Sequence, residues 1–253
     1  MELSGKIAIV TGAASGLGRA VALRFAREGA FVVAADTNET EGESLNRNFS
    51  ELGCEGDFIR TDISTEASVR NLFDATLARH ARVDILYNNA AVLSYELDSQ
   101  VQDLSVETWD YIMGTNLRGP FLCSKHAVPP MMKQGGGSII NVGSPTGLNG
   151  CAPNLTAYST SKAGVIGLTR VMAAAHARHN IRVNSIVPGT MDTPMNDYLF
   201  SNDGLREKYR EAIPLGRLGT PKDIEGLAVF LASEESAYCT GGIYACDGGL
   251  TAV

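Results

Sequence analysis

Short apolar runs alternate with segments of helical periodicity along this chain. Runs rich in β-branched residues occupy 6–11, 31–35 and 181–187 and predict buried strands. An amphipathic helix is predicted over 19–30, and an apolar helix over 157–175. Strands and helices that alternate through short connections predict an α/β fold, a doubly wound parallel sheet of about seven strands with helices on both faces.

The whole chain, residues 1–253, is predicted to form a single domain. Apolar residues make up 44% and charged residues 19% of the sequence, as in ordinary globular domains, and no low-complexity tract or linker interrupts it. A chain of this length can enclose one substantial core.

Charge and composition argue against several classes of protein. The formal net charge is −7 and the lysines and arginines are scattered, so no nucleic-acid partner is expected. No apolar stretch is long enough to span a bilayer, and the acidic N-terminus differs from a signal peptide, so no membrane association is expected. Five cysteines without a CxxC spacing suit reduced thiols in the cytoplasm. His176 and His179 lack a third ligand nearby, so no metal site is predicted.

A glycine-rich turn separates the first predicted strand from the first predicted helix. Gly12, Gly16 and Gly18 in GAASGLG would let the backbone approach a pyrophosphate, and the amides at the helix N-terminus would donate to it. The second strand ends at Asp36, about twenty residues beyond the glycines, where a carboxylate can accept a hydrogen bond from a ribose 2′-hydroxyl. Together these features predict a dinucleotide site of the Rossmann type.

Tyr158 and Lys162 stand four residues apart near the start of the apolar helix. Side chains at this spacing share one face of a helix. An ammonium group beside a phenol favours the phenolate and lowers the pKa of the tyrosine, so Tyr158 is a candidate general acid or base. A chance pairing on a partly exposed helix is the alternative interpretation of this pair alone.

These motifs resemble those of the short-chain dehydrogenase/reductase family, and the likeness extends over nearly the whole chain. TGAASGLG at 11–18 is similar to the family's cofactor loop, and PGTMDT at 188–193 is similar to its PGxxxT segment. NNAA at 88–91 resembles the NNAG motif, with alanine in place of the last glycine. The resemblance implies that the cofactor is bound by Gly12, Ser15, Gly16, Leu17, Gly18, Asp36, Asp62, Ile63, Asn89, Ala90, Ala91, Tyr158, Lys162, Pro188, Gly189, Met191 and Thr193.

The same resemblance implies that the catalytic residues are Asn116, Ser144, Tyr158 and Lys162. Ser144, at the end of the fifth predicted strand, would hydrogen-bond the substrate oxygen. Tyr158 would transfer the proton, and Lys162 would assist Tyr158 and bind the nicotinamide ribose. Asn116 would hold a water molecule beside Lys162. One residue more than usual separates Ser144 from Tyr158, so Thr146 is an alternative catalytic hydroxyl.

The resemblance implies an oxidoreductase that transfers a hydride between NAD and a small secondary alcohol or ketone. Asp36 would repel a 2′-phosphate, and no lysine or arginine stands beside it, so NAD is expected as the cofactor rather than NADP. The alternatives are an NADPH-dependent 3-oxoacyl-carrier reductase, a sugar or polyol dehydrogenase, and a catalytically inactive dinucleotide sensor. The resemblance also implies a homotetramer.

The segments that line the substrate pocket in the family are largely apolar in this chain. They contribute Val92, Leu93, Tyr95, Pro145, Leu148, Cys151, Met191, Met195, Tyr198 and Leu199. This lining predicts a small, largely apolar alcohol, such as a cyclic one, because unpaired hydroxyls are costly to bury. The polar side chains that could instead favour a polyol are Ser94, Glu96, Asn149 and Asn154. Residues 195–212 are predicted to form a helical flap over the ligand.

Overall fold

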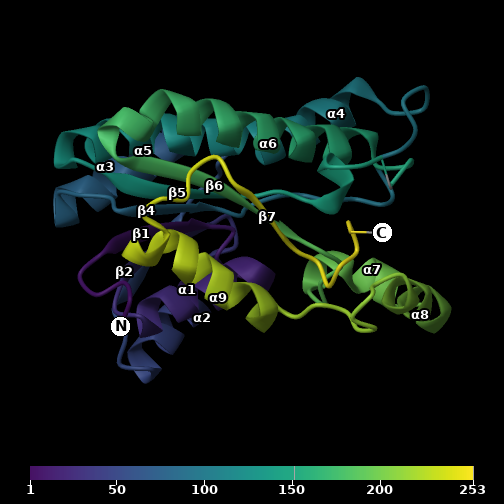
Figure 1. The fold of residues 1–253 in the computed structure, drawn as a ribbon, viewed down its shortest axis with the longest axis horizontal. Helices are drawn as coiled ribbons and strands as arrows, with labels where there is room; N and C mark the ends of the chain where they lie inside the picture. The colour runs from purple at the N-terminus through teal and green to yellow at the C-terminus, as the bar shows by residue number, and fades with distance from the viewer. Residues whose placement is uncertain (151, 253) are drawn as a thin grey trace.

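The seven strands that the described residues form in the computed structural model belong to one parallel sheet (Figure 1). The structure describes residues 1–150 and 152–252. The strands are β1 (Ile7–Thr11), β2 (Phe31–Asp36), β3 (Gly56–Arg60), β4 (Ile85–Asn88), β5 (Gly137–Val142), β6 (Ile181–Pro188) and β7 (Ile243–Cys246). Their order across the sheet is β3-β2-β1-β4-β5-β6-β7, so the chain winds outward in opposite directions from β1 and β4. The predicted doubly wound parallel sheet is confirmed.

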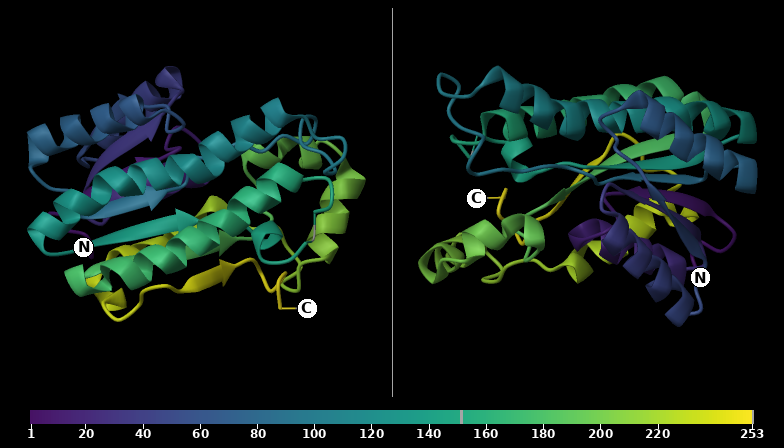
Figure 2. Two further views of the ribbon diagram at one scale, coloured as in Figure 1. Left: turned by 90° about the horizontal axis from the view of Figure 1, so that it is seen from above. Right: turned by 180° about the vertical axis from the view of Figure 1, so that it is seen from behind.

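Helices cover both faces of this sheet (Figure 1, Figure 2). One face carries α1 (Gly16–Arg27), α2 (Glu39–Glu51) and α9 (Pro221–Ala232), and the other carries α3 (Glu66–His80), α5 (Gly119–Gln134) and α6 (Thr156–His176). The shorter elements are α4 (Val106–Met113), α7 (Asp197–Phe200), α8 (Asp203–Glu211), a π-helical turn (Gly114–Arg118) and 3-10 turns (Pro145–Gly147, Ala177–His179, Pro194–Asn196 and Glu234–Ser236). Within the described residues, no helix is both long and apolar enough to cross a membrane.

Alternate residues of the central strands face the two helical layers. In β1, Ala8 and Val10 belong to the core shared with α1, α2 and α9, whereas Ile9 belongs to the core shared with α3, α5 and α6. Every residue of β1 is buried. Strands covered on both faces read as continuous apolar runs, and this explains why the hydrophobic pattern located them.

A row of buried polar side chains crosses this apolar interior. Asn141 in β5 accepts a hydrogen bond from the Nδ2 of Asn88 in β4 (2.9 Å), and its own Nδ2 donates to Thr169 Oγ1 in α6 (2.9 Å). The Thr169 hydroxyl in turn donates to the backbone carbonyl of Val165 (2.8 Å). A buried polar group that loses its partner costs about 1–3 kcal/mol, so this row favours one alignment of β4, β5 and α6.

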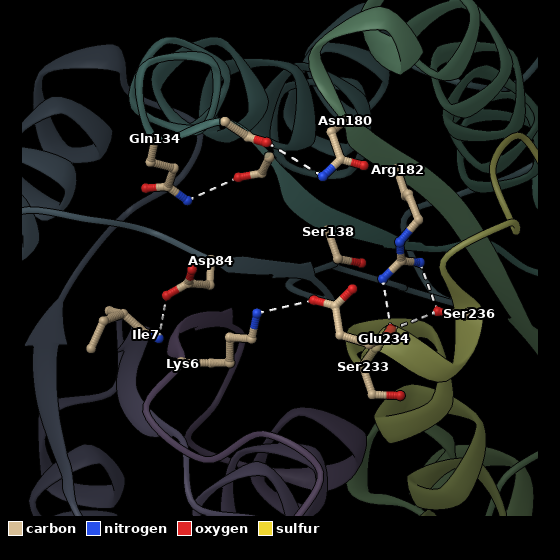
Figure 3. A network of polar contacts seen from close by, with 12 residues as sticks. Lys6, Ile7, Asp84, Gln134, Ser138, Asn180, Arg182, Ser233, Glu234 and Ser236 are labelled. Atoms are coloured by element: carbon tan, nitrogen blue, oxygen red, sulfur yellow. Dashed lines mark hydrogen bonds and ion pairs between the residues drawn. The ribbon is translucent and has the colours of Figure 1, made fainter.

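The amino-terminal edge of the sheet is closed by a second set of polar contacts (Figure 3). The buried carboxylate of Asp84, just before β4, accepts a hydrogen bond from the backbone amide of Ile7 at the start of β1 (2.8 Å). Arg182 in β6 donates to the hydroxyl of Ser236 (2.7 Å). The first contact ties β4 to β1 where the two strands begin, and the second ties the start of β6 to the 3-10 turn Glu234–Ser236.

The carboxyl edge differs from the prediction in one detail. β5 ends at Val142 rather than at Ser144. Pro145 has no backbone N–H with which to continue a ladder, so the chain turns into the 3-10 segment directly after Ser144. The predicted flap over 195–212 contains two short helices, α7 and α8, that project beyond the end of the sheet (Figure 1).

Candidate active site

A cavity of about 550 Å³ lies at the carboxyl edge of the sheet, between the loops that follow β1 and β4. Most of the predicted site residues line it, namely Gly12, Ser15, Gly16, Leu17, Asp36, Asp62, Ile63, Asn89, Ala90, Ala91, Ser144, Tyr158, Lys162, Pro188, Gly189, Met191 and Thr193. The other two, Gly18 and Asn116, are not in the lining. The fold therefore brings together residues that are spread over almost the whole chain.

The glycine loop packs closely against the end of β4. A side chain at Gly12 would place its Cβ 2.7 Å from the Cα of Ala90, and one at Gly18 would collide with the carbonyl of Gly12. The Nδ2 of Asn89 donates to the carbonyl of Gly12 (3.2 Å) and fixes this contact. Gly12 and Gly18 are thus required by packing within the protein, whereas Gly16, with a φ of 52°, makes the left-handed turn into α1.

Two carboxylates stand at the end of the cavity beyond β2 and β3. Asp36 accepts backbone hydrogen bonds from Ala14 through Oδ2 (3.1 Å) and from Asn38 through Oδ1 (3.0 Å). Asp62 accepts from the backbone amide (2.9 Å) and hydroxyl (2.7 Å) of Ser64. Each carboxylate oxygen has two lone pairs, so both groups keep capacity to accept from a ligand.

Ser144, Tyr158 and Lys162 converge at the other end of the cavity. The hydroxyl of Ser144 forms a side-chain hydrogen bond with Tyr158. Lys162 Nζ lies 5.7 Å from the centre of the Tyr158 ring and donates to the Val142 carbonyl at the end of β5 (2.9 Å). Thr146 Oγ1 lies 3.1 Å from Ser144 Oγ. Both hydroxyls line the cavity, and the contact with Tyr158 supports Ser144 rather than Thr146 as the hydroxyl that faces the reacting group.

Burial governs the protonation of this cluster. It raises the pKa of Tyr158 to about 12, and the hydrogen bond from Ser144 opposes only part of that rise. Burial also lowers the pKa of Lys162 to about 8. The sequence analysis expected the ammonium of Lys162 to lower the pKa of Tyr158, whereas the net shift of this pKa is upward because desolvation of the phenolate is the largest effect.

Asn116 lies in the π-helical turn Gly114–Arg118, between α4 and α5. Its side chain holds both backbone groups of Val92. Oδ1 accepts from the Val92 amide (2.8 Å), and Nδ2 donates to the Val92 carbonyl (2.8 Å). Wide turns of this kind alter the regular helical hydrogen bonds and are frequent at functional sites. Asn116 therefore fixes the loop after β4.

Most of the apolar residues that were predicted to line the substrate pocket do line the cavity. Seven of the ten apolar candidates line the cavity, namely Val92, Leu93, Tyr95, Pro145, Met191, Met195 and Leu199. Leu148 and Tyr198 are exposed and outside the lining, and Cys151 lies outside the described residues. The polar candidates Ser94, Glu96, Asn149 and Asn154 are also outside it.

Asn196 is one of several polar lining residues that the sequence analysis missed. Asn196 Nδ2 donates to the carbonyl of Met191 (2.8 Å), and Asn196 Oδ1 accepts from the Tyr95 hydroxyl (3.4 Å). The ring of Tyr95 also stacks on that of Tyr198 in α7, with ring centres 5.4 Å apart. These contacts join the loop after β4 to the segment before α8 across the cavity. No local pattern pairs Tyr95 with residues that lie about a hundred positions later in the chain.

Comparisons with known proteins agree with this geometry. A family profile described as enoyl-(acyl carrier protein) reductase matches residues 12–251. The chain is 39% identical over 250 residues to a 3-oxoacyl-(acyl-carrier-protein) reductase from Thermotoga maritima, and the alignment covers 99% of each chain. The chain belongs to the short-chain dehydrogenase/reductase family.

Other members of the short-chain dehydrogenase/reductase family that resemble this chain differ in the substrates that their names state. A 2,5-dichloro-2,5-cyclohexadiene-1,4-diol dehydrogenase from Sphingobium indicum is 39% identical, with 100% of this chain and 99% of the relative covered. A protein from Beutenbergia cavernae, assigned as an NAD(P)-dependent gluconate 5-dehydrogenase and solved with NADP at low occupancy, is 32% identical. Its TM-score is 0.94, with 100% and 99% of the two chains covered. Membership of the family therefore establishes that the protein is an oxidoreductase. It does not identify the substrate, which has to be inferred from the residues that line the cavity.

Replacing Lys162 should change the pH dependence of the free energy of unfolding of this protein. Burial lowers the pKa of Lys162 from 10.5 to about 8, so the cost of burying its charge is present below pH 8 and disappears above pH 10.5. Lys162→Met should therefore gain free energy of unfolding relative to wild type at pH 7, by an amount that shrinks between pH 8 and 10.5. Urea denaturation across this range measures the difference, with the exposed Lys208→Met as control. A difference independent of pH would contradict the argument.

Proposed function

We propose that this chain is an NAD-dependent oxidoreductase that transfers a hydride between nicotinamide and a small secondary alcohol or its ketone. The observation that carries the proposal is the meeting of Ser144, Tyr158 and Lys162 at one end of a cavity whose other end holds the glycine loop and Asp36. One end offers a proton donor and the other offers groups suited to a dinucleotide.

The residues around the cavity fit a nicotinamide dinucleotide. The N-terminus of α1, which begins at Gly16, provides backbone amides and a favourable dipole for the pyrophosphate. Asp36 has lone pairs available for the adenosine ribose, and Asp62, which also lines the cavity, would stand near the adenine. Pro188, Gly189, Met191 and Thr193 would contact the nicotinamide end, as the motif at 188–193 implies. When bound, the cofactor would accept or donate the hydride.

The side chains of this protein would then handle the substrate oxygen and its proton. Ser144 would donate a hydrogen bond to that oxygen, and Tyr158 would exchange the proton with it. A pKa of about 12 leaves Tyr158 protonated at neutral pH, which suits proton donation during ketone reduction. For alcohol oxidation, Lys162 and the positive charge of the oxidised nicotinamide would have to lower this pKa. Asn116 would support a water relay that connects Lys162 with solvent.

The choice of NAD rests on the charges near the adenosine end. A 2′-phosphate would lie close to the carboxylate of Asp36, and like charges repel. Among the described residues that line the cavity, Lys162 is the only lysine, arginine or histidine, and it lies at the opposite end. The bound NADP of the Beutenbergia cavernae protein shows that relatives of this fold can hold a 2′-phosphate.

The lining favours an apolar substrate, and the cyclic diol dehydrogenase among the relatives supports a ring. The named reductase and gluconate dehydrogenase keep an acyl-carrier reductase and a sugar or polyol dehydrogenase as alternatives. Asn196, Tyr111, Thr115 and Thr190 also line the cavity and could favour a polyol, although Asn196 already makes one hydrogen bond through each polar atom, to the Met191 carbonyl and the Tyr95 hydroxyl. An inactive sensor has little support, because the hydroxyl, phenol and ammonium groups all face one cavity.

The Tyr158 hydroxyl should be essential for turnover. Tyr158→Phe removes only the proton-transferring group, so kcat should fall by about a hundredfold or more, the range expected for general acid–base catalysis. NADH binding, followed by fluorescence titration, should stay close to that of wild type. Tyr238→Phe, which alters a fully exposed phenol, serves as the control. If Tyr158→Phe keeps more than a tenth of the wild-type kcat, the proposed mechanism fails.

Cofactor preference should follow the charge of Asp36. The kcat/KM should be at least about tenfold higher with NAD than with NADP, which corresponds to about 1.4 kcal/mol. Asp36→Asn removes the charge at nearly constant volume and should narrow that ratio mainly by improving the value for NADP. Equal kcat/KM values for the two cofactors with the wild type would refute this assignment.

Substrate class can be tested with compounds of similar size. The kcat/KM with NAD should be higher for cyclohexanol than for gluconate, because each sugar hydroxyl buried without a partner costs about 1–3 kcal/mol. Initial rates of NADH absorbance measure both values. A higher value for gluconate would assign the protein to the sugar acid dehydrogenases and leave the hydride-transfer chemistry intact.

The protein should assemble as a tetramer in the cytoplasm. Apolar side chains on α5 and α6 are exposed in the single chain, including Phe121, Met132 and Val171, and a partner would cover them. Cytoplasmic placement is supported by the four described cysteines, all of which are free thiols. Light scattering at micromolar concentration should give four times the mass of one chain. A monomeric mass would overturn the proposed assembly.

A further inference from the structure

Asp98 is a buried carboxylate outside the set of residues that the sequence linked to catalysis. Its side chain is only 4% exposed and lies in the loop between β4 and α4. Oδ2 accepts a hydrogen bond from the backbone amide of Tyr158 (2.9 Å), and Oδ1 accepts from the amide of Ala157 (3.1 Å). Oδ1 also accepts from the amide of Ser99 (3.0 Å). Both oxygens therefore bind backbone donors, two of which belong to the first turn of α6.

Asp98 replaces a cap that α6 does not provide for itself. The residue at the N-cap position is Leu155, which has no side-chain acceptor, and no side-chain cap is formed there. The first amides of a helix have no partner within the helix and need one from elsewhere. A second contact reinforces the same junction, because the hydroxyl of Thr156 donates to the carbonyl of Ser99 (2.6 Å). The first turn of α6 is thus held by a segment that precedes it by about sixty residues.

This first turn carries Tyr158. Helix ends fray unless they are capped, so the position of the Tyr158 backbone depends on the hydrogen bonds that its amide makes. The hydroxyl of Tyr158 must stay within reach of Ser144 and of the reacting oxygen. Lys162 lies one turn deeper in α6 and is held separately through the Val142 carbonyl. Asp98 therefore acts on Tyr158 more directly than on Lys162.

The segment that carries Asp98 also forms a wall of the substrate cavity. Leu93 and Tyr95 line the cavity, and Val92 at the start of the segment is held by both polar atoms of Asn116. Asn116 and Asp98 thus fix the two ends of a short stretch whose middle faces the substrate. A shift of this stretch would move the wall and the proton donor together.

We propose that Asp98 is a positioning residue for the reaction, one that sets the place of Tyr158 relative to Ser144 and to the substrate by binding the Tyr158 amide. This inference rests on the proposed function. A misplacement of about 1 Å at a reacting group can cost on the order of a hundredfold in rate. Loss of the Asp98 carboxylate should therefore lower kcat while the dinucleotide end of the cavity, built by β1, β2 and their loops, remains intact.

The test compares Asp98→Asn and Asp98→Ala with a matched buried carboxylate. Asp84 is 6% exposed and accepts a backbone hydrogen bond from Ile7 (Figure 3), and it also pairs with Arg82 (2.6 Å). It lies just before β4, at the amino-terminal edge of the sheet, and is not part of the cavity lining. Asp84→Asn should lower the denaturation midpoint and leave kcat unchanged. Asp98→Ala should lower kcat by at least about tenfold, Asp98→Asn should do so to a smaller extent, and the Kd for NADH should stay within about twofold of wild type. The solvent deuterium isotope effect on kcat should rise in both Asp98 variants, because proton transfer becomes slower relative to the other steps.

Each outcome of this experiment is informative. If Asp98→Ala does not fold, the nearly isosteric Asp98→Asn carries the test through its kcat and isotope effect. If the Asp98 variants keep the wild-type kcat, or lose no more of it than Asp84→Asn does, Asp98 has only a structural role and the inference is overturned. Tyr158→Phe, measured alongside, separates this result from a failure of the proposed function. An active Tyr158→Phe refutes the mechanism itself, whereas an inactive one combined with active Asp98 variants refutes only the inference about Asp98.

Discussion

The reversal of strand order between β1 and β4 constrains everything at the carboxyl edge of this sheet. The connection that leaves β1 passes through α1 on one face, and the connection that leaves β4 reaches α5 on the other, so the two loops separate and a crevice opens between them. The topology creates the crevice before any side chain defines its chemistry. Asp36 at one end and Tyr158 at the other then give its two halves different uses.

Features that depend on neighbours in the sequence could be predicted, and features that depend on distant partners could not. Asp36 follows directly from the end of a strand, and Tyr158 and Lys162 share a helix face through their spacing alone. Asp98 and Asn196 acquire their roles from backbone groups or side chains that only the folded chain brings near them. The same limit applies to Gly12, whose closest constraint is Ala90 rather than a ligand.

Electrostatics was the least predictable part of the site. Spacing alone indicates that an ammonium and a phenol lie on one side of a helix, but the pKa of each depends on how much water remains around it. Tyr158 and Lys162 are both buried, and burial favours the neutral form of each. The two groups are therefore arranged so that added positive charge in the cavity, rather than the lysine alone, would bring the phenol toward ionisation.

The row formed by Asn88, Asn141 and Thr169 has a consequence for how this protein can change during evolution. Each of the three side chains forms a hydrogen bond with another member of the row. Replacing one of them by an apolar residue therefore leaves a buried polar group without its hydrogen-bond partner. Substitution of the whole set at once, together with the buried Ser124 that accepts from Asn88 (3.3 Å), could be tolerated, because apolar residues of suitable volume would leave none of these polar side chains without a partner. Homologous chains should therefore either keep the polar residues at these positions or substitute all of them together. The residues at the junction of β4, β5 and α6 should thus vary in a correlated way.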